Sequence, residues 1–160
     1  MKISINTKAY DEAIKFFRNY AKTLEAKQQE LLERLAFLGA TRVSLGFSRA
    51  IYGDKSDVKV DVEINKNKAI IKANGEDVCF IEFGAGIRYG NGYPSDRPEG
   101  IVGIGEYGKG YGNNPNGWWY TGKDGRSHHS YGNPPNAVMY KTSLELAEEI
   151  SMIAREVFKW

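Results

Sequence analysis

The sequence of 160 residues contains a single cysteine and only two histidines, which removes two common kinds of stabilising or reactive site. A lone cysteine cannot form an intramolecular disulfide, so we expect a reducing compartment, with Cys79 as a small core residue of the run DVCFIEF. His128 and His129 are adjacent, and neighbouring side chains of an extended segment point to opposite faces. They are not expected to bind one ion together, and we predict no metal site and no cofactor.

The net charge is also small, and the apolar runs are short. The 22 lysines and arginines against 20 aspartates and glutamates leave a formal charge of +2, too small to imply nucleic acid or an anionic membrane as the ligand. No stretch approaches the ~18 apolar residues of a membrane-spanning helix, and the N-terminal MKISINTKAYDEAIKFF lacks the apolar segment of a signal peptide. We expect one soluble cytoplasmic domain, residues 1–160, without membrane contact or a specific nucleic-acid ligand.

Residue patterns for catalysis are incomplete. GIGEYG, residues 103–108, fits GxGxxG. The segment that follows it, KGYGNNPNG, cannot open the helix that a dinucleotide site requires. Asp124, Ser127 and Ser130 lie near the histidines and supply the residue types of a hydrolase triad without evident rigid geometry. Glu82 has no second acid placed beside it, and we interpret it as a surface or capping residue. The sequence therefore predicts a protein without enzymatic activity.

An amphipathic N-terminal helix is predicted over residues 8–39. Apolar residues recur at alternating steps of three and four, the spacing of one stripe along a helix, and Gly39 follows as a C-terminal stop. The stripe consists of Ile14, Phe17, Ala21, Leu24, Gln28, Leu31, Leu35 and Leu38. It packs either on the protein's own sheet or on a helix of another chain, because its spacing also suits a coiled coil.

Residues 41–83 are predicted to be β-rich. In DVKVDVEIN, residues 57–65, valine and isoleucine alternate with polar residues, the pattern of a strand with one buried face. NKNK supplies a polar turn, and KAIIKAN, residues 68–74, returns as a second strand of an antiparallel hairpin. Residues 41–52 are interpreted as a further strand or an irregular crossover, and residues 77–84 as a short helix or strand.

Glycine and aromatic residues concentrate in residues 84–133. This segment holds 14 of the 18 glycines, and glycine weakens both helix and strand, so we predict a long loop without regular structure. Its aromatic content disfavours permanent disorder. We expect the loop to become ordered when the aromatics of GWWY, Trp118, Trp119 and Tyr120, are buried against a partner.

A second amphipathic helix is predicted over residues 136–158. Pro134 and Pro135 prevent an earlier start, and Asn136 is a suitable N-cap. The expected fold is therefore α+β: a long N-terminal helix and a C-terminal helix packed on an antiparallel β-sheet, with a long Gly/Tyr/Trp-rich loop.

The order of these features resembles the tail-component family of tailed bacteriophages and prophages, described as tail-completion or head-to-tail joining proteins of the neck. The resemblance rests on IEFGAGI at residues 81–87, GWWY at 117–120, a histidine before a Pro-Pro turn, NAVMY at 136–140 and AREVF at 154–158. It spans nearly the whole chain. At NPPNAVMY the family more usually has a small residue followed by proline and phenylalanine. The loop is also unusually rich in glycine and tyrosine, so partner contacts are expected to differ.

The resemblance implies a structural, non-enzymatic virion component that forms a ring and completes the tail or joins it to the head. Its implied partners are other copies of itself and neighbouring neck or tail proteins, in the host cytoplasm during assembly and then in the virion. Aromatic residues of the loop have the types enriched at interface hot spots. The residues predicted to make these contacts are Phe83, Gly84, Gly86, Tyr107, Tyr111, Trp118, Trp119, Tyr120, Pro134 and Pro135.

Two alternatives stay open. In the first, one tryptophan, most simply Trp119, packs on the protein's own sheet and holds the loop in place. In the second, the protein is a small nucleic-acid or glycan binding module, because basic residues interleaved with tyrosines, as in RYGNGYPSDR, can form an aromatic stacking platform.

Overall fold

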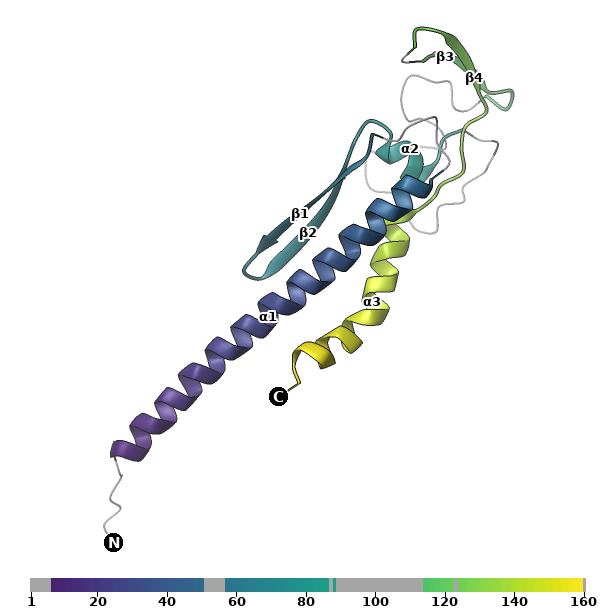
Figure 1. Cartoon of the computed structure of the whole chain (residues 1–160). Helices are drawn as coiled ribbons and strands as arrows, with labels where there is room; N and C mark the ends of the chain where they lie inside the picture. The colour runs from purple at the N-terminus through teal and green to yellow at the C-terminus, as the bar shows by residue number, and fades with distance from the viewer. Residues whose placement is uncertain (1–6, 51–56, 87, 89–113, 123, 160) are drawn as a thin grey trace.

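One long helix, α1, organises the molecule and runs from Thr7 to Arg49 (Figure 1). The computed structural model describes residues 7–50, 57–86, 88, 114–122 and 124–159. Along the chain α1 is followed by β1 (Lys59–Asn65), β2 (Lys68–Asn74), α2 (Val78–Phe83), β3 (Trp118–Thr121), β4 (Ser127–Ser130) and α3 (Val138–Val157). The two long helices and two small antiparallel sheets confirm the predicted α+β class.

Gly39 does not end the first helix, so the predicted boundary is wrong. Gly39 is buried inside α1, where a Cβ atom would lie 2.5 Å from Ile71 Cδ1 and 2.9 Å from Leu146 Cδ1. The glycine therefore allows α1, β2 and α3 to approach closely, and this packing overrides its weak helix propensity. Residues 41–49 continue the helix, which also corrects the strand or crossover expected there.

The β1–β2 hairpin confirms the strongest local prediction. Its strands pair antiparallel from Lys59↔Asn74 to Asn65↔Lys68, so that a two-residue turn joins them. The apolar face of the hairpin is only partly covered, however: Val60 is half-buried, whereas Val62 and Ile64 are exposed. The predicted buried face is thus half-buried along β2, at Ala69, Ile71 and Ala73, but on β1 it is covered only near Val60.

The core is small and lies near the C-terminal end of α1. Val43 and Phe47 from α1, Ile81 from α2 and Val138 from α3 form its buried centre. Cys79 is exposed, which corrects its expected core position: on the short α2 helix it lies two residues before the fully buried Ile81 and faces elsewhere. Although the residue is exposed, the protein partly desolvates its thiol, and this raises the pKa of Cys79; the negative charge of nearby Glu82 raises it further by a smaller amount.

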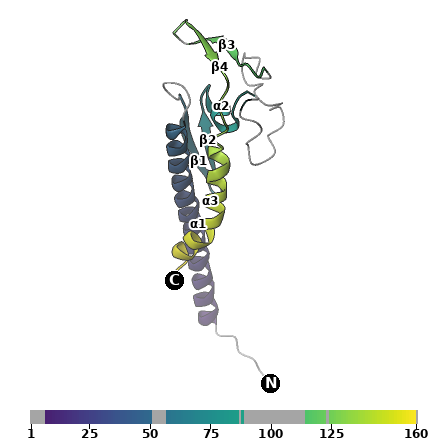
Figure 2. The ribbon, with the colours of Figure 1, turned by 90° about the vertical axis from the view of Figure 1, so that its right-hand side faces the viewer.

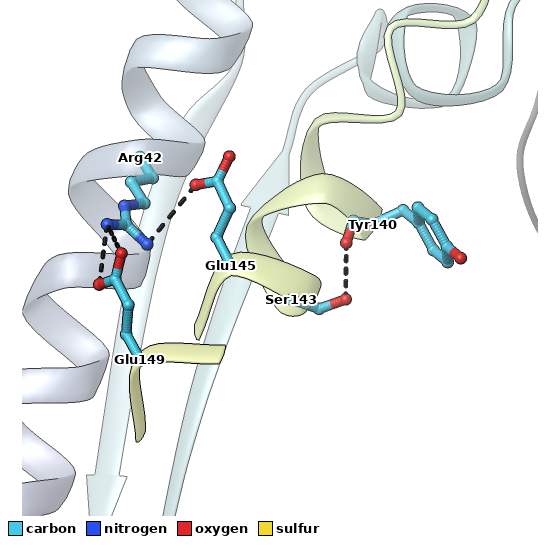
Figure 3. A network of polar contacts seen from close by, with 5 residues as sticks. All are labelled: Arg42, Tyr140, Ser143, Glu145 and Glu149. Carbon is cyan, nitrogen blue, oxygen red and sulfur yellow. Dashed lines mark hydrogen bonds and ion pairs between the residues drawn. The ribbon is translucent and has the colours of Figure 1, made fainter. Parts of the chain in front are cut away.

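α3 packs antiparallel along the C-terminal half of α1 (Figures 1 and 2), and polar contacts join the two helices near the middle of α3 and at its C-terminal end. Arg42 Nη2 donates to both carboxylate oxygens of Glu149 at 2.8 and 3.0 Å, while Arg42 Nη1 forms an ion pair with Glu145 at 3.5 Å (Figure 3). At the C-terminal end of α3, Lys27 Nζ donates to the carbonyl oxygens of Val157 and Lys159. The predicted C-terminal helix is confirmed within two residues at its start and one at its end.

The first part of α1 projects beyond the rest of the molecule (Figures 1 and 2). We call residues 7–23 the arm; every one of them is exposed except Ile14, which is half-buried. The predicted apolar stripe packs on the protein's own elements from Leu31 onward and is largely exposed before it. None of the helices in the described part of the chain combines the length and apolar character needed to cross a membrane.

Candidate interaction site

The segment around GWWY forms a second hairpin rather than an irregular loop. β3 and β4 pair antiparallel from Trp118↔Ser130 to Thr121↔Ser127, which corrects the prediction of no regular structure for this part of residues 84–133. Gly125 follows Asp124 with φ +75°, and its N–H donates to the Gly122 carbonyl oxygen. The five residues 122–126 that join the strands contain two glycines, and a short glycine-containing loop between two strand-like runs is a hairpin signal that could have revealed these strands in the sequence.

The two tryptophans face opposite sides of this hairpin, because adjacent residues of a strand alternate. Trp118 is half-buried, and a Cβ atom on Gly86 would lie 3.1 Å from its Cζ3 atom. Trp119 leaves 69% of its surface exposed. This corrects the alternative in which Trp119 packs on its own chain: the ring that does so is Trp118, beside Gly86.

Trp119 belongs to a group of aromatic and basic side chains that we call the platform: Arg88, Trp119, His129 and Tyr131. The ring centroids of Trp119 and His129 lie 4.9 Å apart, and those of His129 and Tyr131 lie 4.6 Å apart, both edge to face. Arg88 Cζ lies 4.5 Å from the Tyr131 centroid, within cation–π range. The platform is therefore an exposed apolar surface with a cation at its edge.

The other histidine belongs to the opposite face of the hairpin. His128 stacks on Tyr120 at 5.6 Å, and its Nε2 atom lies 3.0 Å from Asp124 Oδ1. The two adjacent histidines thus have separate partners, as predicted for an extended segment. Within the residues that the structure describes, no group of three histidine, cysteine or acidic side chains lies close enough to hold a metal ion.

The hairpin is tied to the body through its base. Ala85 and Asn133 exchange two backbone hydrogen bonds of 2.9 Å, and the Asn133 side chain donates to the Phe80 carbonyl oxygen at 2.8 Å. Gly132, between hairpin and bridge, has φ +88°, and a Cβ atom there would overlap the Ala85 carbonyl oxygen. These contacts connect β4 directly to α2.

The other predicted contact residues have different environments. Gly84 and Gly86 are buried beneath their own chain, against Pro135 and Tyr131 respectively. Phe83 and Pro135 are half-buried, and Pro134 is exposed. Tyr120 lies on the face of the hairpin opposite Trp119. Tyr107 and Tyr111 lie outside the described residues.

Glu82 fills the role of helix cap that the sequence analysis allowed for it. Its buried carboxylate accepts hydrogen bonds from the backbone N–H groups of Met139 at 2.9 Å and Tyr140 at 3.1 Å, at the N-terminus of α3. A carboxylate is favoured there because it satisfies free N–H groups and complements the helix dipole. Asn136 was the wrong choice of cap: Ala137, with φ 50°, occupies the N-cap position, and Asn136 binds the Ile81 carbonyl oxygen instead.

The Asp124 contact predicts a pH dependence of the hairpin. The backbone N–H of Arg126, followed by the His128 side chain, lowers the pKa of Asp124. Because the pKa of Asp124 is lower in the folded protein than in the unfolded chain, its ionised carboxylate stabilises the folded protein. This stabilisation is fully present above a pH of about 3.9, the ordinary pKa of aspartate, and is lost as the pH falls through the lowered pKa. We expect the Arg126 amide resonance to titrate with a midpoint below that value, and Asp124→Asn to remove the step. A midpoint at or above the ordinary value would contradict the assignment.

Comparison of the chain with protein-family models, with curated proteins and with solved structures found no match.

Proposed function

We propose that this protein is a structural, non-enzymatic component of a tailed-phage or prophage virion, and that it assembles by docking the platform against a neighbouring protein. The observation that carries the proposal is the exposed Trp119 ring, held beside His129 and Tyr131 on a hairpin that is tied to the body. Exposed aromatic patches of this kind mark interaction sites. Tryptophan and tyrosine are also the residues that dominate binding energy at interfaces.

The hairpin is anchored to the rest of the chain, and this makes it better suited to docking than an unanchored loop. Because Trp118 and the Ala85–Asn133 bridge already order the strands, a partner that covers Trp119 has less conformational entropy to remove. Together with the resemblance in sequence, this supports a ring of copies that completes the tail or joins it to the head, formed in the host cytoplasm and carried in the virion.

Replacing Trp119 by alanine tests this proposal. Because the ring is mostly exposed, we expect little change in melting temperature, but at least about a 30-fold weaker association, as for loss of a hot-spot aromatic. Light scattering of the purified protein and attachment to isolated tails measure the two steps. Met152→Ala, an exposed apolar residue on α3, is the matched control. Unchanged assembly and attachment in Trp119→Ala would refute the platform's role.

A second candidate function uses the same surface to stack nucleic-acid bases or sugar rings. Arg88 at the edge of Tyr131 favours it, because a cation beside exposed aromatic faces is typical of single-strand binding surfaces. Titration of tryptophan fluorescence with single-stranded DNA and with oligosaccharides separates the two functions. A response that Trp119→Ala abolishes would support the binding module, and no response to either ligand would exclude it.

A further inference from the structure

The arm carries a second exposed aromatic surface, far from the platform. Phe16 and Phe17 leave 65% and 66% of their surfaces exposed, and Tyr10 and Tyr20 are exposed as well. The Phe16 ring stacks on Tyr20 at 6.4 Å and meets Phe17 edge to face at 5.6 Å. A soluble helix normally turns such residues toward a core. Here none of the other described residues forms a core around them, which indicates a surface for docking.

A complementary apolar groove lies farther along the same helix. It has a volume of about 600 Å³ and lies between α1 and β1. Its walls include Phe37 and Leu45 from α1 and Val62 and Ile64 from β1, all exposed, and Phe37 leaves 76% of its surface uncovered. This is the face of the β1–β2 hairpin that the core leaves open.

The arm and the groove cannot meet within one chain. Phe17 and Phe37 lie twenty residues apart on one unbroken helix, which separates them by about 30 Å at 1.5 Å per residue. A rigid helix cannot fold back on itself, so an arm that fills a groove belongs to another molecule.

The charges of the two surfaces are complementary. Over residues 7–23 the arm carries four basic residues, Lys8, Lys15, Arg18 and Lys22, against two acidic ones, Asp11 and Glu12. Among the described residues that line the groove, Glu33 is the only charged one. Glu30 pairs with Arg34 on the same helix, and Glu25 lies 3.9 Å from Lys66. The arm, whose net charge is positive, is therefore attracted to Glu33 in a groove and repelled by another arm, which disfavours arm-to-arm pairing.

We propose that the arm of one copy docks in the groove of the next, burying Phe16 and Phe17 against Phe37, Val62 and Ile64. This inference deepens the proposed function, on which it rests for the need to self-assemble. The interface joins two different patches, so an open chain of copies ends in one free groove and one free arm until a ring closes. The platform then remains available for a different neighbour.

Paired glutamate substitutions test the docking directly. Phe17→Glu disables the arm and Phe37→Glu disables the groove, and both positions are exposed on a helix that tolerates glutamate, so circular dichroism should remain that of the parent. By light scattering we expect each variant alone to be monomeric, with association at least about 30-fold weaker. Met152→Glu, exposed on α3, is the control that should assemble normally.

The mixture of the two variants gives the decisive result. The arm variant keeps its groove and the groove variant keeps its arm, so a 1:1 mixture should form one interface and stop at a heterodimer. A mixture that stays monomeric, or either variant assembling like the parent, would overturn the proposal, as would a parent protein that is monomeric at its solubility limit. Arm-dependent oligomers, together with unchanged self-assembly and unchanged tail attachment in Trp119→Ala, would preserve this inference while removing the platform's role, so the two proposals fail separately.

Discussion

Glu82→Ala is expected to lower the free energy of unfolding by about 2–3 kcal/mol, because two backbone N–H groups at the start of α3 lose a buried charged acceptor. For a chain of this size that corresponds to a fall in melting temperature of roughly 4–12 °C. Differential scanning calorimetry measures both quantities. Glu82→Gln keeps the size and one acceptor oxygen, and should recover about half of the loss.

Glu148→Gln is the matched control for this prediction, because Glu148 is exposed on α3, the helix that Glu82 caps. Its substitution should change stability by no more than about 0.5 kcal/mol. Equal effects at the two positions would show that general loss of negative charge, rather than the cap on α3, accounts for the result with Glu82.

Gly132→Ala is expected to destabilise the base of the β3–β4 hairpin by about 2–4 kcal/mol. Alanine at φ +88° costs about 1–2 kcal/mol in backbone strain. Its Cβ would also overlap the Ala85 carbonyl oxygen, which forces apart the bridge to Asn133 and its two hydrogen bonds of about 1 kcal/mol each. Chemical denaturation followed by tryptophan fluorescence measures the loss, with Trp118 expected to shift to longer wavelength as it leaves Gly86.

Gly125 provides the control that isolates the steric contribution. It has φ +75°, but a Cβ atom there would meet nothing within 4 Å. Gly125→Ala should therefore show only the backbone strain, and the difference between the two variants measures the close approach at the bridge. If the two substitutions lowered stability equally, the close approach of Gly132 to Ala85 would contribute nothing measurable to the free energy of unfolding.

Local periodicity predicted the elements whose burial follows one face. The β1–β2 hairpin and α3 follow from alternation and from a helical stripe, since each presents one side to the core. Gly39 was misread because a glycine after an apolar stripe has the same local appearance whether it ends a helix or allows two other elements to approach. Only the positions of Ile71 and Leu146 decide between these alternatives.

The sequence drew attention to GWWY because of its aromatics, but it did not show how the two tryptophan rings lie. Which ring faces its own chain is set by the register of β3 and by the space above Gly86. The cap on α3 comes from Glu82, which is 57 residues before Met139. No local pattern can reveal a hydrogen bond across such a distance, so Asn136, the nearest suitable residue, was chosen instead.

The pairing of α1 with α3 also determines when the protein can finish folding as it is synthesised. Arg42 and Glu149 are 107 residues apart, which a ribosome needs about 5–20 s to translate. During that interval Val43 and Phe47 have left the ribosome on a helix whose cover does not yet exist. Nascent chains on one messenger are close together at this stage, so the long helix is vulnerable to premature association or to capture by chaperones until α3 emerges.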